Sequence, residues 1–213
     1  MNAASRRLVI PGPAGALEVL RDAPVAGAGS AQRGVAVIAH PHPLYGGTMD
    51  NKVVQTLARA FVASGWEAVR FNFRGVGASA GTYDEGRGER EDFLSVVAAC
   101  APDGLVALAG FSFGAFVVCE AVAPLQARRD IAQIVLVGAA TGRFSVPALP
   151  AELHPQSLVI HGESDDTVPL SEVFAWARPQ NLPVTVIPGA SHFFHGQLPL
   201  LRSLVVRHLR PVV

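Results

Sequence analysis

The chain has 213 residues, of which 50% are hydrophobic and 16% are charged. This length and apolar content predict a single folded domain over residues 1–213 and exclude an intrinsically disordered chain. The 17 basic and 17 acidic side chains give a formal net charge of zero, and no run of one sign occurs. We therefore expect neither a nucleic-acid partner nor attraction to an anionic membrane surface.

The two cysteines, Cys100 and Cys119, lie far apart in apolar, helix-like stretches. This usage is typical of reduced, buried thiols and not of a disulfide framework. Residues 5–10 superficially resemble a twin-arginine export signal, but Pro11, Pro13 and the charges after them interrupt the apolar region that should follow. No apolar run approaches the length of a membrane span. These features predict a cytoplasmic protein.

Strands and helices are expected to alternate along the chain. Residues 6–24 predict two short strands joined by a Pro/Gly turn, as an antiparallel pair at a sheet edge, and residues 26–34 predict a flexible surface loop. Uninterrupted apolar runs, which suit strands buried on both faces of a parallel sheet, follow at residues 34–40, 66–73, 105–111, 131–140, 157–162 and 183–189.

Helical patterns separate these runs, at residues 49–65, 88–101, 113–125, 170–177 and 193–209. Asp50 is the expected cap of the first helix and Gly65 its stop, Pro124 is expected to end the third helix, and Pro199 to kink or delay the last. The alternation predicts an α/β fold with a mostly parallel central sheet and helices on both faces. The connection of residues 138–155 is short and holds three prolines, so no large lid domain is expected.

The pentapeptide Gly110-Phe111-Ser112-Phe113-Gly114 stands where an expected strand ends and an expected helix begins. A G-x-S-x-G pattern in this context is typical of a nucleophile elbow, whose sharp turn strains the serine backbone and lifts its Oγ clear of the sheet. The backbone N–H of Phe113 points to the same space and is an expected oxyanion donor. The alternative is a tight strand–helix turn with an idle serine.

A serine hydroxyl becomes a nucleophile when a base takes its proton and a carboxylate orients that base. In this architecture the acid is expected after the strand at 157–162, where Glu163, Asp165 and Asp166 stand. We favour Asp165, because the turn that follows it aims its side chain inward. Asp166 is then expected to cap the next helix, and Glu163 to be solvated.

The base is expected on the loop after the strand at 183–189, which holds His192 and His195. We favour His192, because it directly follows the turn of residues 189–191, from which the loop reaches back to the serine. His195 would lie one helical turn away, on a satisfied or solvated face.

The second oxyanion donor is expected on the loop within residues 38–51, after the first core strand. Pro41 and Pro43 carry no N–H, so the backbone N–H of His42 is the first candidate and that of Leu44 the second.

Four histidines invite a metal hypothesis, because H-x-H and H-x-x-H pairs bind zinc when their loops meet: His40, His42, His192 and His195. No acidic ligand is fixed beside them, and His192 has a better role as a base, so no metal is expected. The glycines within residues 74–81 miss the G-x-G-x-x-G spacing of a dinucleotide site, so no cofactor is expected either.

At the level of motifs the chain resembles the α/β-hydrolase superfamily, and in particular small bacterial hydrolases related to dienelactone hydrolases. The resemblance rests on HPHPLYGGTMDNKVV, VRFNFRGVGASAGTYDEGRGEREDF, AGFSFGAFV, HGESDDTVP and PGASHFFHG. Carried over by position, the nucleophile, acid, base and two oxyanion donors fall on Ser112, Asp165, His192, His42 and Phe113. The resemblance implies a lidless esterase with an open site for small or short-acyl substrates. Ser112 departs from the cysteine typical of dienelactone hydrolases, which counts against that activity.

Together these patterns predict a serine hydrolase that cleaves small carboxylic esters through an acyl-enzyme intermediate. The same residues would also serve acyl transfer or cleavage of thioesters or amides, and a ligand-binding protein on a hydrolase scaffold is the alternative outside enzymes. We expect a monomer or a homodimer, since the N-terminal edge strand is free to pair. Residues 83–92 are a candidate substrate gate. Candidate pocket-lining aromatics are Tyr45, Phe111, Phe113, Phe144 and Phe193.

Overall fold

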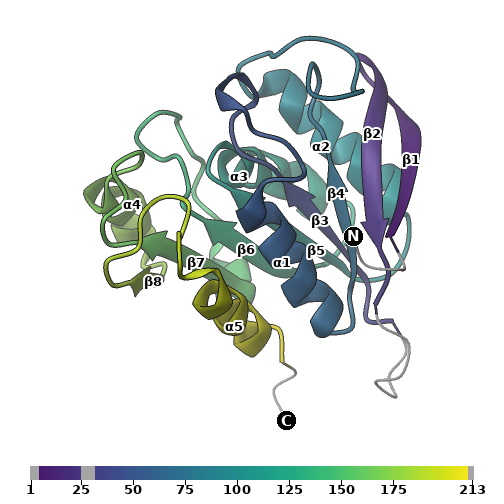
Figure 1. Ribbon diagram of the computed structural model, residues 1–213. Helices are drawn as coiled ribbons and strands as arrows, with labels where there is room; N and C mark the ends of the chain where they lie inside the picture. The colour runs from purple at the N-terminus through teal and green to yellow at the C-terminus, as the bar shows by residue number, and fades with distance from the viewer. Residues whose placement is uncertain (1–4, 25–31, 211–213) are drawn as a thin grey trace.

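Eight strands form one sheet in the order β1-β2-β4-β3-β5-β6-β7-β8 in the computed structural model, which describes residues 5–24 and 32–210. Strands β3 to β8 run parallel, and the hairpin of β1 and β2 joins β4 antiparallel at one edge (Figure 1). The strands are β1 Ser5–Gly12, β2 Gly15–Asp22, β3 Val35–Ala39, β4 Glu67–Phe71, β5 Val106–Phe111, β6 Ile131–Val137, β7 Ser157–Gly162 and β8 Val184–Ile187. The predicted α/β class with a mostly parallel sheet is confirmed.

Burial follows the position of each strand in the sheet. Every residue of β3 and β5 is buried, because helices cover both faces of the central strands and leave no face for polar side chains. In β1, at the predicted edge, Ile10 is the one buried residue. Most of the loop predicted at residues 26–34 lies outside the described residues.

The helices divide into two groups that cover the two faces. They are α1 Lys52–Ala63, α2 Arg87–Cys100, α3 Phe113–Gln126, α4 Leu170–Ala177 and α5 Leu198–His208. Helices α1 and α5 pack against one face, and α2 and α3 lie across the other (Figure 1). Pro199 lies in the first turn of α5, which therefore begins late, as predicted. In the described ranges, no helix combines the length and the apolar character needed to cross a bilayer.

Two helix boundaries differ from the prediction. Asn51, and not Asp50, caps α1: its side chain accepts a hydrogen bond from the Val53 N–H at 2.9 Å, while an Asp50 carboxylate oxygen lies 3.2 Å from Arg70. Pro124 does not end α3, which runs on to Gln126. Proline lacks the N–H that would bond to the carbonyl four residues earlier, but the Ala127 N–H still donates to the Ala123 carbonyl at 3.3 Å, so the last turn continues past Pro124.

Replacing Asn51 with alanine is expected to destabilise the protein by about 1 kcal/mol, because the Val53 N–H loses its acceptor. Asn51→Ser, which keeps a side-chain acceptor at the same place, is expected to stay close to the wild type. Urea unfolding of the three proteins measures the difference, and equal losses in both variants would contradict the capping role.

The connection between β6 and β7 contains only one short 3₁₀ helix, η2, at Ala151–Gln156. Before η2 the segment packs on α4, where the Trp176 indole N–H donates to the carbonyls of Val146 and Pro147 at 3.1 and 3.2 Å. All of this connection is described, and it holds no helical lid, as predicted.

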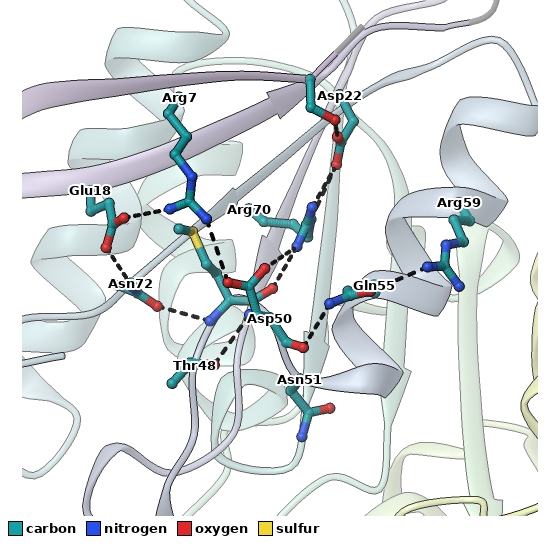
Figure 2. A network of polar contacts seen from close by, with 12 residues as sticks. Arg7, Glu18, Asp22, Thr48, Asp50, Asn51, Gln55, Arg59, Arg70 and Asn72 are labelled. Atoms are coloured by element: carbon teal, nitrogen blue, oxygen red, sulfur yellow. Dashed lines mark hydrogen bonds and ion pairs between the residues drawn. The ribbon is translucent and has the colours of Figure 1, made fainter. Parts of the chain in front are cut away.

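A cluster of polar side chains ties the segment before α1 to the N-terminal hairpin (Figure 2). The buried guanidinium of Arg70, on β4, donates to Asp22 at 3.0 Å and to the Met49 carbonyl at 2.8 Å. The Met49 N–H donates to the Asn72 side chain at 2.8 Å. A buried ion pair such as that of Arg70 and Asp22 is stable only when its remaining hydrogen-bonding groups also have partners. Because Met49 supplies one of these partners, the cluster fixes the position of the segment before α1.

Candidate active site

Ser112 lies on the turn between β5 and α3, with φ 56° and ψ −117°. This left-handed backbone is rare for a residue with a side chain, and it is the strained turn that the G-x-S-x-G pattern predicts. A Cβ on Gly114 would stand 2.4 Å from the Ala39 carbonyl oxygen, and one on Gly110 would stand 2.4 Å from the Gly114 carbonyl. Because these contacts are with backbone, the turn requires glycine at both positions.

The structure brings Ser112, His192 and Asp165 together in one chain of hydrogen bonds. His192 Nε2 lies 3.0 Å from Ser112 Oγ, and His192 Nδ1 lies 2.7 Å from Asp165 Oδ2. The three side chains are buried, with 8, 2 and 6% of Ser112, His192 and Asp165 exposed. When the proton of the neutral His192 ring is on Nδ1 and is hydrogen-bonded to the Asp165 carboxylate, Nε2 is free to accept a hydrogen bond from the serine hydroxyl. The arrangement is able to move a proton from Ser112 to His192.

Asp165 stays ionised in this setting. Burial alone would raise its pKa, but the hydrogen bonds from His192 and from the Val168 N–H outweigh burial and hold the pKa below its usual value. The second carboxylate oxygen accepts the N–H groups of Thr167 and Val168 at 3.0 and 2.8 Å. The turn therefore aims this side chain inward, as the sequence predicted, and keeps a negative charge beside the imidazole.

The other acids and the other histidine of these loops point away from the triad. Asp166 and His195 are exposed, and the exposed Glu163 accepts the Gly189 N–H at 2.8 Å. The prediction that Asp166 caps α4 is wrong. The cap position is Pro169, no side chain caps the helix, and the Asp166 carboxylate accepts instead from the Thr167 hydroxyl at 3.4 Å.

The two predicted oxyanion donors lie on adjoining segments. The His42 and Phe113 rings are 5.0 Å apart between centroids. In the part of the chain that the structure describes, neither backbone N–H is bonded to a protein acceptor. The second candidate, the Leu44 N–H, instead donates to Nδ1 of His42 at 3.2 Å. The geometry thus favours His42 over Leu44 as the free donor, while the role itself stays a prediction.

His40 lies on the same loop but serves the backbone. Its Nε2 accepts the Phe73 N–H at 3.0 Å, so Nδ1 carries the proton and donates to the Pro41 carbonyl at 2.6 Å. Burial lowers the pKa of His40 to about 4. Both nitrogens are therefore occupied. Among residues 5–24 and 32–210, no group of three or more His, Cys, Asp or Glu side chains is placed to hold a metal ion.

The candidate lining residues differ in burial, and Phe144 is half-buried and packs against the core. Phe111 and Phe113 are fully buried and belong to the core, whereas Tyr45 and Phe193 are 76 and 44% exposed beside the site. Tyr83, which the sequence analysis did not name individually, packs on His42 with the rings 4.8 Å apart. This contact places the start of the 83–92 segment next to the loop after β3, which carries the predicted oxyanion donor His42.

A third buried histidine, His161, was missed. It lies four residues before Asp165, and its Nε2 is 3.4 Å from the same carboxylate oxygen that His192 contacts. The available signal was a single imidazole in an otherwise apolar strand, Ser157–Gly162.

Comparison with known proteins points to hydrolases of this architecture. The family model described as X-Pro dipeptidyl-peptidase (S15 family) matches residues 23–142. A crystal structure of an α/β serine hydrolase without lid from Xanthomonas campestris is 37% identical, with a TM-score of 0.87 over 100% of this chain and 98% of that one. An α/β serine hydrolase homologue from Coxiella burnetii is 40% identical, with a TM-score of 0.82 over 96 and 97% of the two chains. An uncharacterized Rickettsia prowazekii protein is 42% identical over 94 residues, which span 41% of this chain and 39% of that relative.

Proposed function

Because the chain belongs to the α/β serine hydrolases without a lid, and to the family described as X-Pro dipeptidyl-peptidase (S15 family), it is a hydrolase, and we propose that it cleaves small carboxylic esters with a Ser112-His192-Asp165 triad. One observation carries the proposal. A single imidazole bridges a strained serine and a buried carboxylate, at 3.0 and 2.7 Å.

The reaction follows from the position of each proton. His192 Nε2 takes the Ser112 hydroxyl proton while Oγ attacks the ester carbonyl, and the Asp165 carboxylate stabilises the imidazolium that forms. The N–H groups of His42 and Phe113 donate to the oxyanion. His192 then returns its proton to the departing alkoxide, which leaves as an alcohol. Next, His192 deprotonates a water that attacks the acyl-Ser112 ester, and the carboxylic acid product departs as Oγ regains its proton.

The imidazole of His42, on the segment after β3, is held neutral. Burial and the nearby Arg143 cation both lower the pKa of His42. Peptide cleavage, which the name of the matched family suggests, is the second candidate and enters the test below.

Intact-mass analysis after exposure to a small fluorophosphonate tests the nucleophile. We expect one adduct on the wild type, none on Ser112→Ala, and slow labelling of His192→Ala. His195→Ala is the matched control and is expected to label like the wild type, since its imidazole is exposed and outside the triad.

A panel of short-chain aryl esters, thioesters and X-Pro amides then separates the reaction classes. The proposal requires the highest kcat/KM for esters. An unlabelled wild type would overturn the enzyme assignment and favour a ligand-binding protein on a hydrolase scaffold. A labelled wild type that prefers X-Pro amides would overturn only the ester assignment.

A further inference from the structure

His161 is a fully buried imidazole near the end of β7, the strand next to the sheet edge at β8. It is the penultimate residue of β7, pairs in register with Val186 of β8, and has 0% of its surface exposed. The residues before it in the strand, Leu158, Val159 and Ile160, are apolar. A buried polar ring in such a strand requires partners, because an unpaired one would lose its hydrogen bonds to water.

The contacts of His161 determine where its proton lies. Nε2 is 2.8 Å from the Val168 carbonyl oxygen and 3.4 Å from Asp165 Oδ2. The Val168 carbonyl only accepts, so Nε2 carries the hydrogen and donates it to this carbonyl, with the Asp165 carboxylate in contact beside it. Nδ1 is buried, and no group among the described residues bonds to it. Burial also lowers the pKa of His161, which agrees with a neutral ring.

The His161 N–H and Val168 together surround the Asp165 carboxylate with contacts. The Val168 N–H donates to Asp165 Oδ1 at 2.8 Å, and the Val168 carbonyl accepts from His161 at 2.8 Å. Asp165 Oδ2 lies between His192 Nδ1 at 2.7 Å and His161 Nε2 at 3.4 Å. Both carboxylate oxygens of Asp165 thus contact neighbouring groups, and the bond from His161 to the Val168 carbonyl links the loop that bears Asp165 to β7.

From this geometry we infer that His161 is a positioning residue, which holds Asp165 so that Oδ2 faces His192. The inference rests on the triad role proposed above for Asp165. Groups fixed by such supporting contacts reach the geometry of reaction more often than groups on an unsupported loop.

Core packing alone does not account for the imidazole. An apolar side chain of similar size would fill the same volume without leaving a buried nitrogen unpaired at Nδ1. What the imidazole adds is the N–H at Nε2, which donates to the Val168 carbonyl and lies 3.4 Å from Asp165 Oδ2.

Three substitutions separate positioning from packing. His161→Phe fills the volume without a donor. His161→Gln places an amide N–H near the position of Nε2, whereas His161→Asn carries the same amide on a side chain one methylene shorter, near the position of Nδ1. We expect kcat for a short-chain aryl ester to fall about 10-fold in His161→Phe and His161→Asn, with KM changed less than about two-fold, and to recover in His161→Gln.

Proton NMR gives a readout that does not depend on turnover. The Nδ1–H shared by His192 and Asp165 is expected to give a low-field resonance in the wild type and His161→Gln, and to weaken or shift in the other two variants. His208→Phe is the matched control. Its imidazole lies 3.3 Å from the Gln156 carbonyl, just before the opposite end of β7, so it tests loss of a histidine–carbonyl contact away from the triad.

Wild-type kcat and resonance in His161→Phe would overturn the inference, as would equal losses in His161→Gln and His161→Asn. If His161→Phe does not fold, the comparison of the two amide variants decides alone. Failure of the proposed function is distinguishable in the wild type itself, because an inactive triad takes up no fluorophosphonate and a wrong substrate class appears in the substrate panel.

Discussion

Replacing Asp165 with asparagine is expected to lower kcat for a short-chain aryl ester by about 10⁴-fold while the fold is retained. The carboxylate accepts the His192 Nδ1–H at 2.7 Å and so leaves Nε2 free to take the Ser112 proton. An amide nitrogen in its place donates to Nδ1. The proton then moves to Nε2, the tautomer that is unable to act as the base.

Asp166→Asn is the matched control for this substitution. Asp166 is the next residue, is exposed, and makes no contact with His192, so its loss is expected to leave kcat close to the wild type. Steady-state kinetics on the two variants, with circular dichroism to check folding, makes the comparison. A greater loss in Asp166→Asn than in Asp165→Asn would reject the assignment of the acid.

Lowering the pH from 7 to 4 is expected to remove about 3 kcal/mol of folding stability through His40 alone. Burial lowers the pKa of His40 from 6.5 to about 4 in the folded protein. Between these two values the unfolded chain binds a proton that the folded chain does not, so the free energy of unfolding rises with pH. The contribution is complete above pH 6.5 and is lost as the pH falls toward 4.

His40→Gln isolates this effect, because the glutamine side-chain oxygen is able to accept the Phe73 N–H but does not titrate. The variant is expected to be less stable than the wild type at pH 7 and to lose less stability on acidification. Urea unfolding at pH 7, 5 and 4 measures how the free energy of unfolding of each protein changes with pH. His161 and His208, whose pKa values burial also lowers, are present in both proteins and cancel in the comparison. Parallel slopes would show that His40 does not titrate between these limits.

Local patterns in the sequence determined the elements and the turn at Ser112. Apolar β-branched runs predicted the strands because a strand buried on both faces has no polar positions. Gly110 and Gly114 identified the elbow because a Cβ at either position collides with neighbouring backbone. The order of serine, acid and histidine along the chain then indicated the loops that were expected to meet.

Choices between adjacent residues were less certain from sequence. The expected caps, Asp50 and Asp166, were both wrong, because a cap depends on which residue has extended backbone directly before the helix. Asp50 contacts Arg70 instead, a pairing that forms only once β4 lies beside the segment before α1. Side-chain propensity carries no information about such a neighbour.

Tertiary structure alone decided the partners of the candidate site. His192 is 27 residues from Asp165 and 80 residues from Ser112, so their meeting depends on the parallel order of β5, β6, β7 and β8. The bond from the Phe73 N–H to His40 Nε2 joins residues 33 positions apart, so it depends on β4 lying beside β3. The sequence by itself determined which chemical groups the loops carry. Packing determined which of those groups face one another, because distances across the sheet depend on the whole fold.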